Sequence, residues 1–217
     1  YDERDNVVSL VRNPKPGSSA NPLTITAEYE PLWNKLAWIK DAMERRTDLS
    51  YYNQPEQVGG AIAGLPSLLK EAKRPSVNGS RPSYRYRYDE RGLLRWERDP
   101  TDRLTTRTYD ALGNLTSETT GADGVGGQSA LNLTTEYRYT GSAGALGDAT
   151  EIENPRDRTT FYIYDGMRRR TQETRHDGDA TAARLASTQW VYDASGQVLQ
   201  VRRATNFGAP QGWSTQT

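Results

Sequence analysis

The stretch YDERGLLRWERDPTDRLTTRTYDALGNL, residues 88–115, decides the fold because it contains two turn signals in alternation. In YDERGLL and YDALGNL, a Tyr-Asp pair is followed by Gly three residues after the Asp. An Asp accepts hydrogen bonds from backbone N–H groups ahead of it, and Gly readily takes the left-handed conformation that closes a bulged hairpin. In DPTDRLT, Asp99-Pro100 suits a type I turn, because Pro fixes φ at the second position. The stretch therefore predicts strands joined by tight turns.

The Tyr signal recurs through the whole chain. It stands at Tyr1, Tyr29, Tyr51, Tyr88, Tyr109, Tyr139, Tyr164 and Tyr192. In four copies the pair is complete: Tyr88-Asp89, Tyr109-Asp110, Tyr164-Asp165 and Tyr192-Asp193. Three of these four keep the turn glycine, as Gly92, Gly113 and Gly196. We expect these three glycines to have positive φ.

The second turn signal lies between the Tyr copies. In residues 41–52, 99–110 and 154–165, Arg45, Arg103 and Arg158 each stand six residues before a Tyr. Each repeat then holds two strands and two turns, and eight repeats make about sixteen strands, whereas open twisted sheets rarely exceed about 10 strands without curling. The prediction is an all-β chain: an array of antiparallel hairpins over residues 1–217 that forms a curved or spiral β-sheet wall.

These motifs resemble the YD-repeat or RHS-repeat family, through Tyr-Asp-x-x-Gly-x-Leu followed by Asp-Pro-x-x-Arg-x-Thr. The resemblance covers nearly the whole chain. It implies a spiral wall that forms part of a hollow shell, as in bacterial RHS toxins, toxin-complex components and the teneurins. Glu44, Asp102 and Asp157 stand where the family often has Gly before the Arg of the second turn.

The resemblance also implies a function. The chain would be a structural segment of a shell that encapsulates a C-terminal toxin or another passenger polypeptide. Its partners would be the remaining shell repeats and the passenger of the same parent polypeptide, together with secretion-apparatus components. The implied location is secreted or cell-surface, with export from a bacterium by a dedicated secretion system. Since Tyr1 already lies within a motif, we expect the sequence to be an excerpt of a longer chain.

Residues 56–80 depart from the repeat. In GGAIAGLPSLLKEAKRP, residues 59–75, Ile62, Leu65, Leu68 and Leu69 have roughly helical spacing and Pro75 would end a helix. We expect a helical or loop insertion here. It would either cover apolar side chains of the wall or serve as a docking element.

Composition excludes several other classes of protein. Lys and Arg together number 28, and so do Asp and Glu, so the balanced charge does not favour nucleic acid as a partner. The basic residues are 23 Arg and 5 Lys, which suits pairing with carboxylates. The chain has no Cys and no apolar run of the length that spans a membrane. His176 is the only histidine, and no grouping typical of catalysis, a metal site or a cofactor site is readable, so we expect a protein that is not an enzyme.

The alternative function is a carbohydrate-binding repeat module of a cell-surface or secreted protein. In that case Trp33, Trp38, Trp96, Trp190 and Trp213 would stack on sugars. In a wall we instead expect Tyr86, Trp96, Tyr162 and Trp190 to be mostly buried between neighbouring strands.

A three-residue loop at 90–92 would set the register of the hairpin. Asp89 would pair with Leu93, Tyr88 with Leu94, Tyr86 with Trp96 and Arg85 with Glu97. The same arithmetic places Tyr109 opposite Leu115 and Tyr192 opposite Val198.

Overall fold

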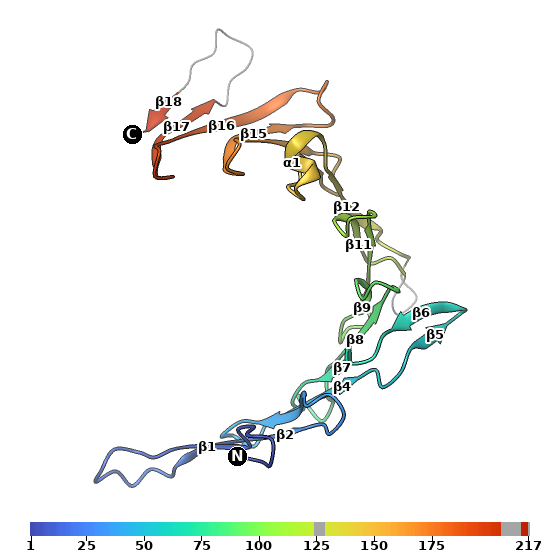
Figure 1. The fold of residues 1–217 in the computed structure, drawn as a ribbon, viewed down its shortest axis with the longest axis vertical. Helices are drawn as coiled ribbons and strands as arrows, with labels where there is room; N and C mark the ends of the chain where they lie inside the picture. Colours follow the sequence, from blue (N-terminus) through green and yellow to red (C-terminus); the bar gives the residue numbers. More distant parts are fainter. Residues whose placement is uncertain (124–128, 205–213, 217) are drawn as a thin grey trace. The chain divides into compact units, whose positions relative to one another are not determined.

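The computed structural model describes residues 1–123, 129–204 and 214–216 (Figure 1). Almost all regular structure in these residues is antiparallel β-strand, and the one α-helix among them is the short α1 (Gly141–Ala145). The all-β fold of antiparallel hairpins predicted from the sequence is confirmed. The chain divides into two compact units, with unit 1 formed by residues 1–106 and 121–130 and unit 2 by residues 107–120 and 131–217.

Unit 1 contains a sheet with the strand order β1-β2-β3-β4-β7-β8-β9-β10 and a separate two-stranded sheet, β5-β6. The strands are β1 (Ser9–Arg12), β2 (Leu23–Tyr29), β3 (Leu36–Lys40), β4 (Arg46–Tyr51), β5 (Glu56–Val58), β6 (Ala61–Gly64), β7 (Leu69–Lys73), β8 (Ser83–Tyr88), β9 (Leu94–Arg98) and β10 (Leu104–Tyr109). The first half of β10 belongs to unit 1 and its second half to unit 2.

Unit 2 continues with the order β11-β12-β13-β14-β15-β16-β17-β18. Its strands are β11 (Leu115–Thr120), β12 (Leu133–Arg138), β13 (Glu151–Glu153), β14 (Thr159–Tyr164), β15 (Arg170–His176), β16 (Arg184–Tyr192), β17 (Val198–Ala204) and β18 (Ser214–Gln216). Within each unit, neighbouring strands in space are neighbours in sequence, apart from the β5-β6 insertion.

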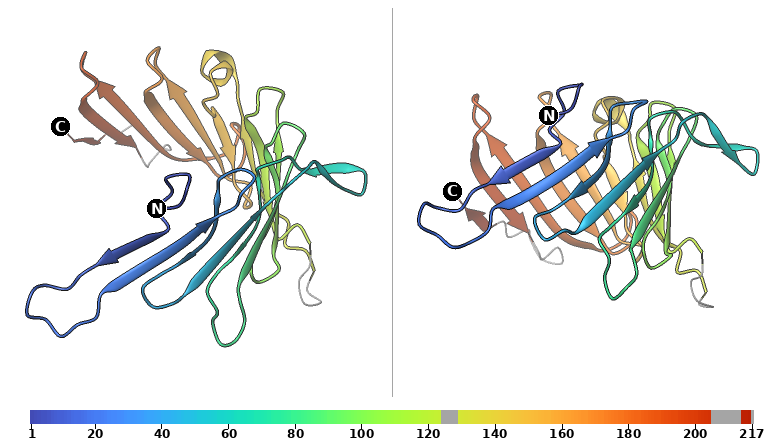
Figure 2. Two further views of the ribbon diagram at one scale, coloured as in Figure 1. Left: turned by 60° about the horizontal axis from the view of Figure 1, so that its bottom comes forward. Right: turned by 90° about the horizontal axis from the view of Figure 1, so that it is seen from below.

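In the part of the chain that the structure describes, the main sheet of each unit is a single layer, with no second sheet packed over it (Figure 2). Among the described residues, only four apolar side chains are buried: Tyr52, Ala63, Ala72 and Ala204. Tyr86, Trp96, Tyr162 and Trp190, which we expected to be mostly buried, are each partly buried. A single layer covers an aromatic side chain with its in-plane neighbours alone, so one side of the ring stays near water.

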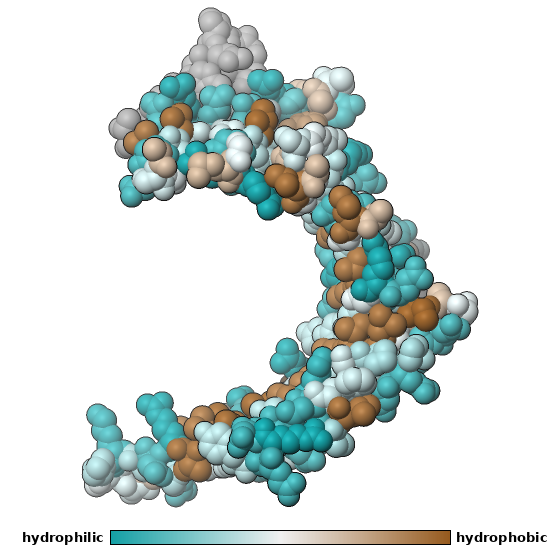
Figure 3. All heavy atoms as spheres, in the orientation of Figure 1, coloured by the Kyte–Doolittle hydropathy of each residue, from teal (hydrophilic) through white to brown (hydrophobic). Residues whose placement is uncertain are grey.

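The two faces of the unit 1 sheet differ in chemistry, since side chains alternate along each strand. One face carries Ser50, Glu71 and Arg85 in register, and we name it the charged face. The other carries Leu49, Ala72 and Tyr84 in register, and we name it the tyrosine face. Figure 3 shows apolar side chains interspersed among hydrophilic ones along this unit.

The register between β8 and β9 matches the prediction only beside the turn. Asp89 N–H donates to the Leu93 carbonyl at 2.9 Å, and Tyr88 pairs with Leu94, as predicted. Beyond that point a β-bulge shifts the pairing by one residue, so Trp96 lies opposite Arg87. The expected pairs Tyr86–Trp96 and Arg85–Glu97 were therefore wrong. Their actual pairs are Tyr86–Glu97 and Arg85–Arg98.

The bulge recurs beside the repeat Tyr. Shifts of register stand next to Tyr29, Tyr51, Tyr88, Tyr164 and Tyr192, and in each case the returning strand of the hairpin carries the extra residue. Tyr192 pairs with Val198, as predicted. An extra residue on the returning strand increases the local twist of the pair. The sequence arithmetic missed it because it assumed regular pairing.

The insertion expected within residues 56–80, as a helix or a loop, contains no helix. Residues 56–64 form the β5-β6 hairpin, because Gly59 and Gly60 both have positive φ, 62° and 83°, and make a tight two-residue turn. Leu69 begins β7, which pairs with β4. The apolar residues at helical spacing therefore belong to a hairpin, a turn and a strand of the main sheet.

The hairpin is inserted into a repeat turn whose ends keep their usual bonds. Tyr52 N–H donates to the Leu68 carbonyl, and Ser67 N–H donates to the Tyr52 carbonyl, both at 2.9 Å. Asp89 makes the same two bonds with Leu93 and Gly92. Ser67 has φ 69°, close to the 79° of Gly92. The insertion thus lengthens a turn without changing how its strands meet.

Eight turns share one backbone geometry, although the sequence suggested two classes. Each begins at an Asp or Asn and has positive φ at its fourth residue. The fourth residues are Asp5, Glu44, Gly92, Asp102, Gly113, Asp157, Arg168 and Gly196. The positive φ predicted for Gly92, Gly113 and Gly196 is confirmed, with values of 79°, 90° and 90°. Glu44, Asp102 and Asp157, where the family often has Gly, adopt the same left-handed conformation.

We expect Gly196→Ala to lower the free energy of unfolding by about 1–2 kcal/mol, because an L-residue resists left-handed φ. Crowding does not contribute, since the nearest atom to a Cβ at this position is Arg169 Nη1 at 3.7 Å. Gly166 lies in the equivalent turn of the preceding hairpin, outside the left-handed region and with open space around it. Gly166→Ala should be neutral or slightly stabilising. If urea denaturation shows the same loss of unfolding free energy for both variants, the positive φ of Gly196 is not the cause of its effect.

Candidate functional site: the clamped turns and the tyrosine ladder

Each of the eight turns is clamped by the side chain of its first residue. Asp89 Oδ1 accepts from the N–H groups of Arg91 and Leu93, both at 2.9 Å. Asn154 Oδ1 accepts in the same way from Arg156 and Arg158, at 2.9 and 3.2 Å. One side-chain oxygen thereby satisfies two backbone donors that a bare loop would leave to water.

The clamp lowers the pKa of Asp110, Asp165 and Asp193. Hydrogen bonds from the Asn114 side chain and backbone hold the pKa of Asp110 below its ordinary value. For Asp165 the main cause is the Arg169 backbone N–H, and for Asp193 it is the Ser195 hydroxyl. The ionised carboxylate is the better acceptor, so the turns favour the charged form.

The turn after Tyr29 uses a longer acid in a longer loop. Glu30 accepts from the N–H groups of Leu32, Trp33 and Lys35, at 2.8, 2.7 and 3.1 Å. Glu30 N–H donates to the Lys35 carbonyl, one residue further along than in the Asp turns. The extra methylene of Glu is matched by one extra loop residue, and Asn34 takes the left-handed position with φ 54°.

The repeat tyrosines connect successive hairpins through their hydroxyls. Tyr51 donates to the Leu36 carbonyl at 3.0 Å, and Leu36 is the residue paired with Tyr29. Tyr192 likewise donates at 2.7 Å to the carbonyl of Arg170, the partner of Tyr164. Each hydroxyl therefore reaches the residue beside the preceding repeat Tyr.

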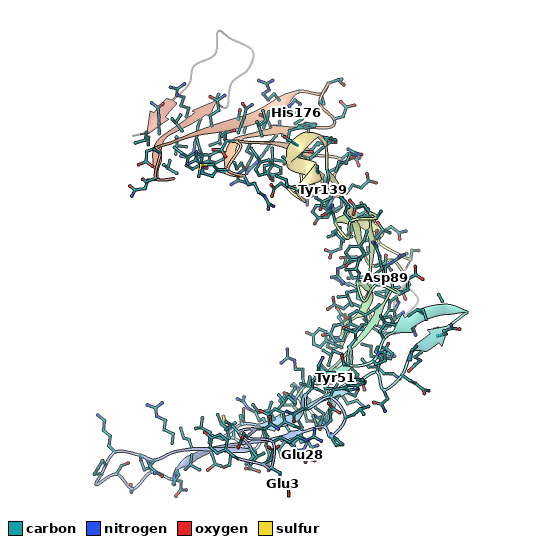
Figure 4. All side chains as sticks on the ribbon, viewed as in Figure 1. Glu3, Glu28, Tyr51, Asp89, Tyr139 and His176 are labelled. Atoms are coloured by element: carbon teal, nitrogen blue, oxygen red, sulfur yellow. The ribbon has the colours of Figure 1, made fainter. Side chains whose placement is uncertain are left out.

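Two further tyrosines extend this ladder in unit 2. Tyr139 donates to the Leu115 carbonyl and Tyr164 to the Ala149 carbonyl, both at 2.9 Å. Figure 4 labels Tyr51 and Tyr139, one in each unit, along with Asp89 at its turn. We call these hydroxyl-to-carbonyl bonds the tyrosine ladder.

Tyr88 is packed instead against the inserted hairpin. Its ring meets the Tyr52 ring edge-to-face, with centroids 6.4 Å apart. Burial, followed by the neighbouring Tyr52, raises the pKa of Tyr88 to about 12. Tyr52 donates from its hydroxyl to the Tyr86 carbonyl at 2.8 Å, so it anchors the insertion to β8. The sequence analysis did not single out Tyr52, and its position directly after Tyr51 is the signal that could have done so.

Arginine side chains cover the tryptophans of the strands. The guanidinium carbons of Arg46, Arg87 and Arg170 lie 4.5, 4.4 and 4.8 Å from the ring centroids of Trp38, Trp96 and Trp190, respectively. Such cation–π contacts occupy the ring face that a sugar would need. Trp33 lies in a turn and is 38% exposed, and Trp213 lies outside the described residues.

The predicted arginines act mainly through their backbones. The N–H groups of Arg45, Arg103 and Arg158 donate to the clamping side chains at 3.0, 3.0 and 3.2 Å. Arg45 also pairs with Asp41 through its guanidinium, and Arg158 with Asp177. The regular spacing thus marks the end of a clamped turn.

His176 has an ordinary structural environment. It is 7% exposed, packs edge-to-face against Phe161 with centroids 5.3 Å apart, and places Nδ1 3.1 Å from the Ala182 carbonyl oxygen. Within the described ranges there is no cluster of three or more His, Asp or Glu that could hold a metal ion. A search of the same residues finds no helix with the length and apolarity needed to cross a membrane.

Residues 88–125 match the family model of the RHS repeat, which confirms the resemblance for that stretch. No curated protein matches the sequence.

Solved structures of Tc toxin proteins share the fold. A crystal structure of TcdB2-TccC3 is 15% identical with a TM-score of 0.56, and covers 84% of this chain and 11% of its own. The same assembly without its hypervariable C-terminal region is 16% identical with a TM-score of 0.55, and covers 90% and 11%. A Tc holotoxin pore of Photorhabdus luminescens is 13% identical with a TM-score of 0.52, and covers 90% and 12%. The present chain therefore spans about a ninth of the length of these structures, and the likeness concerns the fold.

We expect Tyr192→Phe to lower the free energy of unfolding by about 1 kcal/mol, the usual net worth of one hydrogen bond. The substitution removes only the hydroxyl that donates to Arg170. Tyr29 is the matched control, because it occupies the same repeat position in a hairpin whose Tyr hydroxyl makes no hydrogen bond to a described residue. Tyr29→Phe should leave the urea midpoint unchanged. Equal effects of the two substitutions would contradict the ladder.

Acid should weaken the clamped turns. Because the folded-state pKa of Asp193 lies below its ordinary 3.8, the stability from its ionised form is present above that pH and is lost as pH falls through the folded value. Asp193→Asn should show a smaller fall in Tm between about pH 5 and about pH 2, since an amide oxygen can accept the same bonds at every pH, as in Asn154. If Tm falls with pH by the same amount in Asp193→Asn and in the parent chain, Asp193 does not contribute to the loss of stability in acid.

Proposed function

We propose that this chain is a segment of an RHS-type wall that encloses a toxin or another passenger polypeptide. The observation that carries the proposal is the tyrosine ladder in a single-layer sheet. A sheet without a second layer gains little from a core. Here the hydroxyls of Tyr51, Tyr139, Tyr164 and Tyr192 each bond a hairpin to the one before it. Such an array suits a wall that is extended by repetition, because each repeat contacts mainly its neighbours.

Two further observations support a wall. Residues 88–125 match the RHS repeat, and the fold recurs in structures of Tc toxin assemblies. One of those structures is the TcdB2-TccC3 assembly without its hypervariable C-terminal region, and another is a Tc holotoxin pore. By analogy, the partners of this chain would be further repeats of the same parent polypeptide and the passenger. Export from a bacterium to the outside or to the cell surface, with secretion-apparatus components as transient partners, belongs to the same proposal.

The carbohydrate-binding alternative has less support. A sugar platform requires aromatic rings that are exposed together, and the strand tryptophans carry guanidinium groups on their faces. Micromolar binding on a glycan array that is lost in Trp38→Ala or Trp190→Ala would favour the alternative.

Protease protection in the parent polypeptide tests the proposal. An intact wall should keep the passenger uncut by a broad-specificity protease at concentrations that degrade the isolated passenger within minutes. The double variant Tyr164→Ala and Tyr192→Ala removes two ladder bonds and should expose the passenger to cleavage, as followed by mass spectrometry. Tyr29→Phe is the control and should keep the protection. A passenger cut equally fast in the parent and in isolation would overturn the proposal.

A further inference from the structure

A pocket opens on the charged face of unit 1, beside the base of the inserted hairpin. Its walls come from β4, β7, β8 and β9 and from the start of β5. Its lining includes Tyr52, Arg87 and Trp96 together with Glu56, Lys70 and Glu71. The insertion supplies Glu56, so this pocket has no counterpart in a repeat with a short turn.

Most charged groups that line the pocket already have partners. Lys70 pairs with Glu56 at 2.6 Å, and Glu71 accepts from the Ser83 hydroxyl at 2.6 Å and pairs with Lys73 at 3.2 Å. Arg85 pairs with Asp102 at 3.1 Å, across the charged face. Within each of these pairs, the positive and the negative side chain neutralise each other.

Arg87 is the exception. Its guanidinium carbon lies over the Trp96 ring, 4.4 Å from the centroid, and it makes no ion pair or side-chain hydrogen bond with any residue that the structure describes. Stacking on the ring occupies the face of the guanidinium and leaves its N–H edges free. A stacked guanidinium with free edges is pre-organised for bidentate binding of a planar anion.

The charge of the pocket selects the kind of anion. Its lining holds three cations, Lys70, Arg85 and Arg87, against the two carboxylates Glu56 and Glu71. The excess is one positive charge, which one carboxylate neutralises. A phosphate dianion would leave a net negative charge near two glutamates, at an energetic cost.

We propose that this pocket binds a carboxylate side chain of an acidic peptide segment, with Arg87 as the bidentate donor. An acidic sugar fits less well, since Tyr52 is 3% exposed and Trp96 lies under Arg87, which leaves neither ring free as a platform. The proposal concerns residues of unit 1 alone and does not depend on enclosure of a passenger.

Two-dimensional NMR of the Trp96 indole N–H tests the proposal. The probe is an acetylated, amidated pentapeptide with a central Glu, and the signal is assigned through Trp96→Phe. We expect the signal to shift saturably with millimolar peptide, and the same peptide with Gln in place of Glu to shift it at least tenfold less. Inorganic phosphate and glucuronate should bind at least several-fold more weakly than the Glu peptide.

Substitutions of Arg87 complete the test. Arg87→Met keeps an unbranched side chain over Trp96 without the charge and should abolish binding, whereas Arg87→Lys should retain a weaker interaction. Arg95 is the matched control, because it is an exposed arginine in the same hairpin, and Arg95→Met should bind the peptide as well as the parent chain does. Circular dichroism verifies that each variant is folded. Binding that persists in folded Arg87→Met, or that favours the Gln peptide, phosphate or glucuronate, would overturn the proposal.

Discussion

The clamped turn is the interaction on which the remaining structure depends. In a sheet with a second layer, burial of one face penalises a slip of register, because a shift by one residue turns every side chain over. Here neither face of the main sheet is sealed from water, and few apolar side chains are buried. The register must therefore be set locally. The acceptor at the first residue of each turn fixes which N–H groups are bonded, and the left-handed fourth residue fixes where the returning strand begins.

The clamp also determines where the tyrosine ladder forms. Tyr164 and Tyr192 directly precede a clamping Asp, and Tyr51 directly precedes Tyr52, the first residue of the lengthened turn, so the position of the Tyr relative to its turn is the same in these hairpins. Beside it the bulge adds one residue to the returning strand and increases the twist. The hydroxyl then reaches the carbonyl next to the preceding repeat Tyr, as Tyr51 reaches Leu36 and Tyr192 reaches Arg170. The turn thus positions the Tyr hydroxyl for a hydrogen bond to the preceding repeat.

The sequence was sufficient for the fold class and for the turns, because Asp, Gly and Tyr act there through short-range backbone geometry. It did not show that the Asp-Pro turns and the Tyr-Asp turns share one conformation, since Asp102 and Asp157 adopt a φ for which Gly is the usual signal. The bulge was missed for a related reason: the extra residue, such as Arg95, carries no distinctive side chain. The helix predicted from Leu65, Leu68 and Leu69 failed because apolar spacing is ambiguous over short runs, whereas Gly59-Gly60 is a strong turn signal. Arg87 could not be identified from the sequence, because two features of the structure distinguish it. No described residue forms an ion pair with its guanidinium, and the β-bulge places it opposite Trp96.

The inserted hairpin adds a pocket to the sheet without changing how the neighbouring strands pair. Tyr52 and Ser67 reproduce the backbone bonds of an ordinary turn, so β4 and β7 meet as any other pair of strands does. The added strands then stand beside the charged face, where Tyr52 is held by the Tyr86 carbonyl and packs closely on Gly64, at which a Cβ would lie 2.3 Å from the ring. Turns are exposed and tolerate added length at little entropic cost. Each turn fixes the register of its own two strands, so an insertion at one turn leaves the neighbouring hairpins unchanged. Turns can therefore acquire new side chains and new contacts while the strands keep their common pattern.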